Sequence, residues 1–342
     1  MRKHSWKAAC VALLAASAVL LGGCASSAEA KPEPQPTQAP LKAQATVAWP
    51  KDKLQANGQG EPTLTVYVAN EGGNESVALE RYVEGVLAGE MQNDWPLEAL
   101  RAQAILARTF VLKFVQDKQS KYEGADISTD IEEAQAYDQA AVNDPIRKAV
   151  AQTEGVVLAS GGQLPYAWFH AHSGGMTARA KEGLNWNKAE PEYTRVAQGN
   201  EPEEADAAHA EALEAAQAWE ASFAADEFAA ACKSIGAPVK LGATTALSVA
   251  ERGESGRALT LDVGGQSVNA SELRIALGST KMRSTLLTGL RIKNGQIEMS
   301  GKGYGHGVGM SQWGAYAMAQ NGQTAEEIIA HYFRDVSLAT LW

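Results

Sequence analysis

The chain has 342 residues and a formal net charge of −10 at pH 7, with 40 acidic side chains against 30 Lys and Arg. This acidic balance argues against nucleic-acid binding, because a phosphate backbone is recognised by a basic surface. We find no repeat of fixed period, which disfavours solenoid and propeller folds.

The first 24 residues have the features of an export signal. A basic start precedes an apolar run over residues 8–21, which is too short for an ordinary membrane-spanning helix. The run ends in Leu21-Gly22-Gly23-Cys24, which resembles the lipobox of bacterial lipoproteins. That resemblance implies that Cys24 carries a lipid and that the protein is anchored to the outer face of the cytoplasmic membrane. The alternative is a plain secretory signal in which Cys24 has no role.

Residues 25–60 are predicted to form a flexible tether, because this stretch is polar and proline-rich and cannot bury a core. Beyond it, about 280 residues are enough for one large core or two smaller ones. Cys10 lies in the signal and Cys24 at its end, so Cys232 is the thiol left after processing. An intramolecular disulfide is therefore not expected.

The mature domain is predicted to start with a strand over residues 64–68 and a turn at residues 71–74. A helix is expected from about Leu79 to Met91, because apolar residues recur at helical spacing. After a break at residues 92–94, an alanine-rich helix is expected from Leu97 to about Phe114. Its small side chains favour close packing against another element.

The second half alternates between strand and helix patterns. Residues 156–159 and 164–172, joined by a Gly161-Gly162 turn, predict a β-hairpin. The acidic, alanine-rich segment at about 198–236 is predicted to be helical, with its charge run from Glu201 to Glu214 on a solvated face. Three further strands are expected at residues 246–250, 258–263 and 267–268, before a glycine-rich loop and two short helices. The last helix starts with the capping box Thr324-x-x-Glu327. This order predicts an α+β fold of mixed helices and antiparallel strands over residues 61–342.

Glu90 stands out because it falls on the apolar stripe of the first helix. A carboxyl turned towards the interior has a raised pKa, which suits a general acid near neutral pH. The alternative is that Glu90 ends the helix and turns back to solvent.

Several segments, in order along the chain, resemble the SpoIID/LytB family, which includes a sporulation lytic transglycosylase and an amidase enhancer. The first covers residues 79–91, 95–104 and 107–110. The others are residues 169–177, which contain Ser173-Gly174-Gly175-Met176-Thr177, residues 252–257, and the segment from Gly303 to Ala315.

The resemblance implies that Glu90 is the catalytic acid and base of a lytic transglycosylase. Such an enzyme cuts the bond between N-acetylmuramic acid and N-acetylglucosamine in peptidoglycan and closes a 1,6-anhydro ring. One carboxyl suffices because the attacking 6-hydroxyl already belongs to the substrate. The resemblance also favours substrate binding by Tyr304, His306 and Gln312. Further candidates in the matching segments are Arg101, Gln103, Arg108, His170, His172 and Ser173.

Alternatives stay open for several of these residues. His306 could line the glycan groove, or it could belong to a tight structural turn and cap the following helix. Arg101 and Arg108 could anchor substrate or pair with nearby carboxylates. His170 and His172 could form half of a zinc site, as in some relatives, but no cysteine lies near them. No cofactor or metal is therefore expected.

Two other functions compete with a lytic transglycosylase. The first is a non-catalytic peptidoglycan-binding protein that stimulates a cell-wall amidase. The second is a metal-dependent amidase, which the missing third ligand disfavours. The expected partners are peptidoglycan glycan strands, a cell-wall amidase and, through the lipid anchor, the membrane facing the cell wall.

Overall fold

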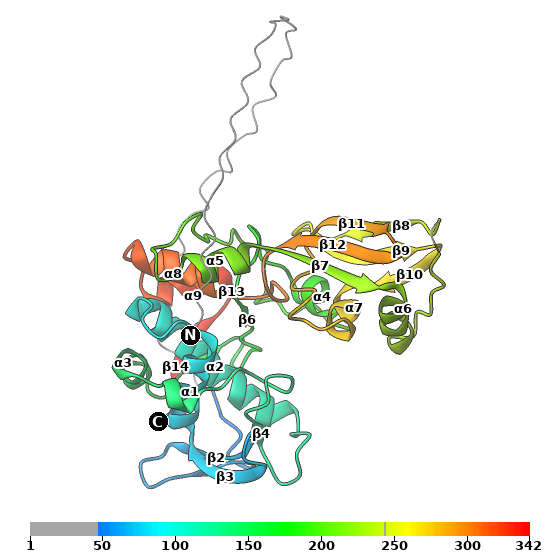
Figure 1. Ribbon diagram of the computed structural model, residues 1–342. Helices are drawn as coiled ribbons and strands as arrows, with labels where there is room; N and C mark the ends of the chain where they lie inside the picture. Colours follow the sequence, from blue (N-terminus) through cyan, green and yellow to red (C-terminus); the bar gives the residue numbers. More distant parts are fainter. Residues whose placement is uncertain (1–46, 243) are drawn as a thin grey trace, which may run out of the picture. The chain divides into compact units, whose positions relative to one another are not determined.

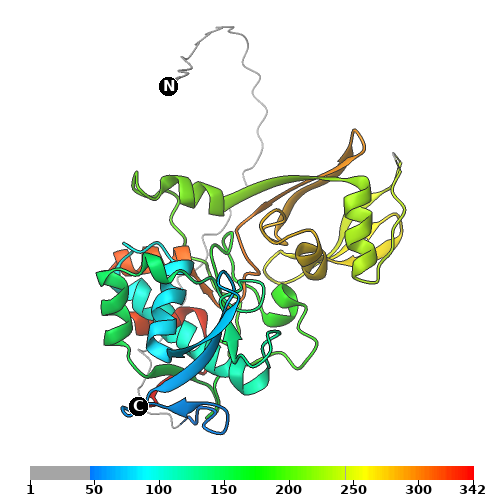
Figure 2. The same ribbon diagram turned by 60° about the horizontal axis from the view of Figure 1, so that its bottom comes forward.

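The structure is a computed structural model that describes residues 47–242 and 244–342 (Figures 1 and 2). The predicted signal, the lipidation site at Cys24 and most of the predicted tether lie outside these residues, and the lipid anchor stays a prediction. Within the described part of the chain, no helix has the length and apolar character needed to cross a membrane. Helices and largely antiparallel strands are mixed, which confirms the α+β class.

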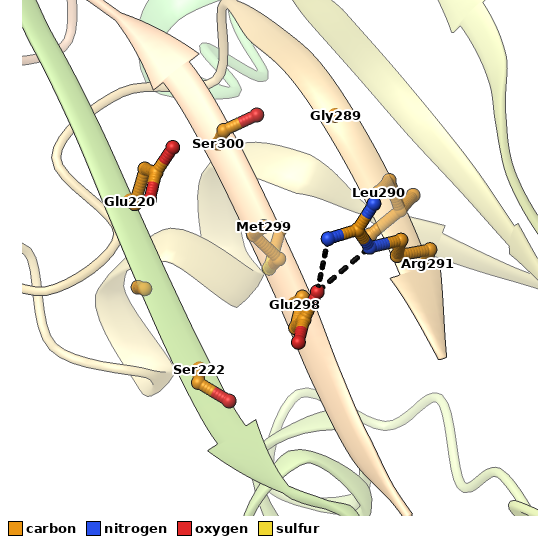
Figure 3. A pocket seen from close by; sticks show the side chains of 9 residues that line it. Glu220, Ser222, Gly289, Leu290, Arg291, Glu298, Met299 and Ser300 are labelled. Atoms are coloured by element: carbon orange, nitrogen blue, oxygen red, sulfur yellow. Dashed lines mark hydrogen bonds and ion pairs between the residues drawn. The ribbon is translucent and has the colours of Figure 1, made fainter. Parts of the chain in front are cut away.

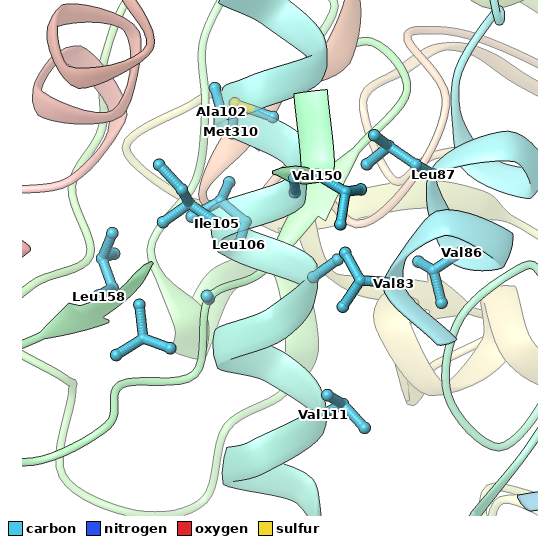
Figure 4. Close-up of a cluster of buried hydrophobic side chains, with 14 of the residues drawn as sticks. Val83, Val86, Leu87, Ala102, Ile105, Leu106, Val111, Val150, Leu158 and Met310 are labelled. Atoms are coloured by element: carbon cyan, nitrogen blue, oxygen red, sulfur yellow. The ribbon is translucent and has the colours of Figure 1, made fainter. Parts of the chain in front are cut away.

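The first hydrophobic core is built around two consecutive helices, α1 (Leu79–Glu90) and α2 (Leu97–Asp117). Val83, Val86 and Leu87 of α1 face the alanine-rich side of α2 (Figure 4). The small side chains of α2 allow it to be buried on several sides at once, as the sequence predicts. It contacts α3 (Asp144–Gln152), α8 (Gln312–Gln320), α9 (Ala325–Tyr332) and β5 (Val156–Ala159).

Short strands complete this first part. Strand β2 (Pro62–Val68) pairs with β1 (Gln55–Ala56), with β3 (Gly73–Ala78) and, in parallel, with β4 (Ile127–Ser128). Strand β5 pairs with the C-terminal β14 (Ser337–Thr340), and β6 (Phe169–His170) pairs in parallel with β13 (Met310–Ser311). Two short helical elements, η1 (Gln139–Ala141) and α4 (Ala180–Leu184), lie in the connections.

A second core forms between residues 219 and 299. It contains one antiparallel sheet of β7 (Ala218–Ala224), β12 (Gln296–Lys302) and β11 (Leu287–Lys293). The other sheet contains β8 (Leu247–Arg252), β9 (Ala258–Val263) and β10 (Gln266–Asn269). Helix α6 (Ala225–Ser234) packs against the first sheet, and α7 (Ala270–Ala276) packs against the second. Cys232 is buried here, and burial raises the pKa of its thiol to about 11, so it acts as a small apolar side chain.

The predicted helix over residues 198–236 is wrong before residue 210 and in its middle. Helix α5 (Ala210–Gln217) leads into β7, which leads into α6, as Figure 2 shows. Trp219 and Phe223 are buried on one face of β7. Their spacing of four residues fits a helix stripe and a strand face equally well, so the pairing with β12 decides the structure.

Two further predictions are corrected by long-range contacts. The predicted tether does not extend to residue 60, because Val47, Trp49 and Leu54 are buried in the first core. The predicted hairpin also fails. In the described residues a single bridge, Ser160 to Gln163, spans the Gly161-Gly162 turn, and Pro165 comes two residues later. Proline lacks the N–H that a ladder needs, and β5 takes β14 as its partner instead.

Candidate functional site

Glu90 is the last residue of α1, and its side chain is half-buried. Its Oε1 accepts a hydrogen bond of 2.7 Å from the backbone N–H of Ala136, and its Oε2 accepts one of 3.4 Å from the amide of Gln312. Burial raises the pKa of Glu90, and it outweighs the two hydrogen bonds, which favour the carboxylate and lower the pKa. The carboxyl therefore does not point into bulk water, and its more loosely held oxygen is Oε2.

The loop that holds Oε1 lies directly on α1 because α1 carries glycine where the two meet. A Cβ atom at Gly89 would come within 2.6 Å of the Tyr137 nitrogen and 2.8 Å of the Ala136 carbonyl carbon. Gly85 likewise leaves space for the ring of Tyr137. These contacts fix the Ala136 N–H against the Glu90 carboxyl.

Replacing Gly89 with alanine should push this loop away and lower the free energy of unfolding by about 1–3 kcal/mol, the usual cost of overpacking. The Ala136 hydrogen bond should lengthen, so the pKa of Glu90 should rise further. Chemical denaturation and NMR titration of the Glu90 carboxyl measure the two effects. Gly73→Ala is the control, since a Cβ there meets nothing within 4 Å. Equal stability of both variants would contradict the tight contact.

Gln312 is held against Glu90 by contacts on both sides of it in the sequence. Ser311 pairs with His170 in the parallel bridge between β13 and β6, and the N–H of Trp313 donates to the Ala171 carbonyl. Ser311 also caps α8, because its Oγ accepts from the N–H of Gly314. The first residue of α8 is thus placed by a strand and a helix cap together.

Glu201 joins the Ser-Gly-Gly segment to the start of α8. Its Oε1 accepts hydrogen bonds from the Ser173 N–H at 2.6 Å and from the Ser311 hydroxyl at 2.7 Å. The Glu201 side chain is 5% exposed, and the His172 Nδ1 lies 3.8 Å from the same oxygen. The solvated face predicted for the charge run is therefore wrong at Glu201. Nothing in the local sequence distinguishes this glutamate from its exposed neighbours.

Arg257 holds the same segment from the other side and is fully buried. Its guanidinium donates to the carbonyls of Ser173 at 2.6 Å and Met176 at 2.8 Å, and to the Ser255 hydroxyl at 2.9 Å. Ser255 in turn donates through its N–H and hydroxyl to Glu182. Burial lowers the pKa of Arg257 to about 10, so it stays charged near neutral pH. Residues 252–257 thus hold the Ser-Gly-Gly segment in position, a role that the sequence alone did not reveal.

Gly307 packs its α-carbon against the Arg257 guanidinium at a φ of 83°. A side chain at this position would collide with the guanidinium and would also strain the backbone. The glycine-rich loop is therefore built around the buried arginine.

His306 is a structural residue of this loop. Its Nδ1 accepts from the N–H of Val308 at 3.0 Å, and the ring also bonds to the backbone of Phe169. Burial, with Arg274 and Arg257 nearby, lowers the pKa of His306 to about 3, so the ring is neutral. This favours the structural-turn alternative, although Ser311, not His306, caps the following helix.

His170 and His172 are each held to the backbone through Nδ1. The His170 Nδ1 is bonded to the Val308 carbonyl, and the His172 Nδ1 accepts from the N–H of Gly174. Burial lowers the pKa of both rings, and their Nε2 atoms are buried without a hydrogen-bond partner in the described residues. In residues 47–242 and 244–342, no three His, Cys, Asp or Glu side chains are grouped as metal ligands. Cys232 belongs to the second core.

Three predicted substrate-binding residues are placed elsewhere. Arg108 is fully buried and forms a 2.5 Å ion pair with Glu80, so it cannot contact a polymer. Gln103 is fully buried as well. Arg101 pairs with Glu98 at 2.8 Å and Glu326 at 3.5 Å, which supports the charge-pairing alternative.

Ser173, His172 and Tyr304 do lie together. The backbones of His172 and Tyr304 form a bridge, and Ser173 connects to Gln312 through Glu201 and Ser311. The structure therefore links Gln312, and with it Glu90, to the Ser-Gly-Gly and glycine-rich segments.

The residues on either side of Glu90, Gly89 and Met91, line an open cavity of about 480 Å³. Another cavity, of about 580 Å³, lies on the sheet of β7, β12 and β11 (Figure 3). There the Arg291 guanidinium pairs with Glu298 and lowers the pKa of that carboxyl. A carboxylate held ionised in this way is a poor proton donor, so Glu90, whose pKa is raised, is the better candidate for acid catalysis.

Comparison with known proteins gives two family matches. Residues 70–159, which include Glu90, match the SpoIID family, described as stage II sporulation protein. Residues 204–309, which include Arg257 and His306, match a domain of unknown function.

Curated relatives are similar over most of this chain. Stage II sporulation protein D of Bacillus amyloliquefaciens is 28% identical over 311 residues, covering 82% of this chain and 81% of that protein. The Bacillus subtilis (strain 168) protein of the same name is 29% identical, covering 81% of this chain and 79% of that protein. The amidase enhancer of B. subtilis is 27% identical, covering 75% of this chain and 40% of that protein.

Proposed function

Because this chain belongs to the SpoIID/LytB family, we propose that it cleaves peptidoglycan glycan strands as a lytic transglycosylase. The relatives support a role connected with the cell wall. The observation that carries the finer proposal is the Glu90 carboxyl, which is half-buried, has a raised pKa and accepts hydrogen bonds from Ala136 and Gln312.

The reaction needs one group that first gives and then takes a proton. Protonated Glu90 donates from Oε2 to the oxygen that links N-acetylmuramic acid to N-acetylglucosamine, and the bond from the muramyl C1 to that oxygen breaks. The muramyl 6-hydroxyl then attacks C1 and gives its proton to the Glu90 carboxylate, which restores the acid. The new C1–O6 bond closes the 1,6-anhydro ring, and no water is consumed.

The hydrogen bonds of Glu90 suit this exchange. Oε1 is held firmly by the Ala136 N–H, which fixes the direction of the carboxyl. Oε2 has the longer bond to Gln312 and is the oxygen free to carry the proton. Ordinary glycosidases need a second carboxylate to activate water or attack the sugar. Glu201 is bound to Ser173 and Ser311 inside the protein, so it is poorly placed for that role.

The proposal is tested by digesting peptidoglycan, with and without its stem peptides, and analysing the products by mass spectrometry. Products with 1,6-anhydromuramyl ends are expected. Reducing ends would show a hydrolase instead. No cleavage, combined with stimulation of an added amidase, would favour the binding role.

The pH dependence gives a separate test through Gln312. The raised pKa of Glu90 keeps the acid form populated to higher pH than for an ordinary glutamate, and kcat/KM should fall as pH rises through it. The Gln312 hydrogen bond favours the carboxylate and lowers this pKa. In Gln312→Met the fall of kcat/KM at alkaline pH should therefore occur about half a pH unit higher.

Gln320→Met is the matched control, because Gln320 lies at the other end of α8 and bonds to the Tyr316 hydroxyl. Its pH profile should equal that of the unmodified protein. A fall of kcat/KM that occurs at lower pH in Gln312→Met would contradict the assigned role of the amide.

A further inference from the structure

Aromatic side chains surround a small hollow beside the C-terminal half of α2. We name it the aromatic recess, and it has a volume of about 50 Å³. Its lining residues are Phe110, Phe114, Lys118, Tyr166, Trp168 and Trp186. Phe114 is 17 residues after Leu97, or about 25 Å along the helix, so the recess is separate from the Glu90 site.

The rings of the recess hold one another in place. Tyr166 stacks on Trp168 with centroids 5.1 Å apart, and Trp186 meets Trp168 edge-on at 5.3 Å. The Trp186 N–H donates to the Ala189 carbonyl, and the Tyr166 hydroxyl donates to Asp117. With these polar atoms satisfied within the protein, the recess presents rigid apolar walls to a ligand.

Three lysines surround these rings. Lys113 lies over Tyr166, Lys118 over Phe114 and Lys188 over Trp186, each between 5.2 and 5.4 Å from the ring centroid. Of the three, Lys113 also pairs with a carboxylate, that of Asp117. The rim therefore carries positive charge on a chain whose net charge is −10. Charge complementarity favours a ligand that bears carboxylates.

The volume and shape of the recess limit the ligand further. About 50 Å³ admits a group of a few heavy atoms, such as a methyl with its adjoining carbonyl, but not a whole sugar ring. The large apolar side chains that stand exposed in the described residues are Ile131, Met176 and Ile275, and none belongs to the recess. Rings that line a hollow instead of projecting suit a ligand that reaches in better than insertion into a bilayer.

We propose that the aromatic recess is an accessory glycan-binding subsite that takes the N-acetyl group of an amino sugar, with neighbouring carboxylates of the strand at the lysines. The acetyl methyl packs between the rings, and the acetyl carbonyl faces the Lys118 ammonium. This inference rests on the proposed function for its ligand but not on catalysis. The subsite gives the protein a second binding site for a long glycan strand.

Binding is measured by calorimetry on the full processed chain carrying Glu90→Gln, so that no strand is cut. Chitohexaose and cellohexaose share one backbone and differ in the acetamido group at C2. Chitohexaose should bind and cellohexaose should not, and Trp186→Ala should weaken chitohexaose binding by about fivefold or more. Tyr122→Ala is the control, because Tyr122 also stacks on a tyrosine beneath a lysine but is not part of the aromatic recess.

Lys118→Gln tests the charge without disturbing the rings. It should weaken binding of glycan strands freed of stem peptides, whose muramyl groups carry carboxylates, and the loss should shrink at high salt. Chitohexaose lacks carboxylates, and the glutamine amide can still donate to the acetyl carbonyl, so its binding should fall much less. Equal binding of cellohexaose, or no effect of Trp186→Ala on either glycan, would overturn the proposal. Loss of binding to phosphatidylglycerol vesicles in Trp186→Ala, with glycan binding intact, would identify a membrane-docking surface instead.

These outcomes are independent of the cleavage assay. If the chain cuts no glycan but binds chitohexaose through Trp186, the subsite stands and the transglycosylase proposal fails. If it forms anhydromuramyl ends but Trp186→Ala binds normally, the reverse holds.

Discussion

Replacing Glu90 with glutamine should reduce the release of anhydromuramyl products by about a thousandfold or more, within the range found for removal of a general acid and base. The amide has the shape of the carboxyl, and its oxygen can still accept from the Ala136 N–H. It cannot deliver a proton to the departing oxygen or collect one from the 6-hydroxyl. Because the buried carboxyl is removed, the variant should be as stable as the parent or more so. Product analysis and thermal unfolding together check both statements.

Glu84 offers a matched control on the same helix. Burial also raises the pKa of Glu84, but this residue has no bond to Gln312 or to the loop at Ala136. Glu84→Gln should therefore cleave at nearly the parent rate. A comparable loss of cleavage activity in both variants would show that the raised pKa of α1 carboxyls matters only for folding. Glu90 would then have no part in the reaction.

Replacing Arg108 with methionine should lower the free energy of unfolding by about 3–5 kcal/mol, the usual cost of leaving a buried charge without its partner. Arg108 is fully buried and binds Glu80 through two nitrogens, at 2.8 and 2.5 Å, as well as the Val156 carbonyl. Methionine fills much of the space but leaves the Glu80 carboxylate unpaired apart from the N–H of Gly155. Chemical denaturation measures the loss.

Arg101→Met provides the comparison, seven residues earlier on α2. Its partners are Glu98 and Glu326, and all three side chains are between 21% and 30% exposed. Exposed pairs contribute about 0–1 kcal/mol, so this variant should be nearly as stable as the parent. A similar loss in both variants would contradict the structural role of the buried pair. A fall in glycan affinity in Arg108→Met at full stability would restore its predicted substrate contact.

The helices near Glu90 could be predicted from the sequence because their signals are local. The apolar stripe of α1, Pro96 before α2 and the capping box at Thr324 each lie within a few residues of the element they define. The capping box is present as predicted, with Thr324 and Glu327 bonding to each other's backbone N–H.

The other half of the site could not be derived from local patterns. Gln312 meets Glu90 across 222 residues, and Glu201 meets Ser311 across 110. Such contacts depend on how β6 and β13 pair, which no spacing within either segment specifies. The resemblance named both Glu90 and Gln312, which the structure brings into contact, and their roles stay predictions. The burial of Arg108 and Gln103, also predicted to bind substrate, depends on the packing of α2.

The buried arginine also bears on how this protein can be divided. The segment that matches the SpoIID family ends at residue 159, whereas Arg257 belongs to the separately matched stretch 204–309. Excising that stretch would strip the Ser173 and Met176 carbonyls of their donor and leave Glu182 without the N–H and hydroxyl of Ser255. The stretch 204–309 is therefore tied to residues 173–182, which lie between the two matched segments, and it cannot be exchanged as an independent module. A chimera that replaces residues 204–309 with the counterpart from a relative would need an arginine and a serine at the positions of Arg257 and Ser255, because the Ser173 carbonyl and the Glu182 carboxylate stay behind in the host chain.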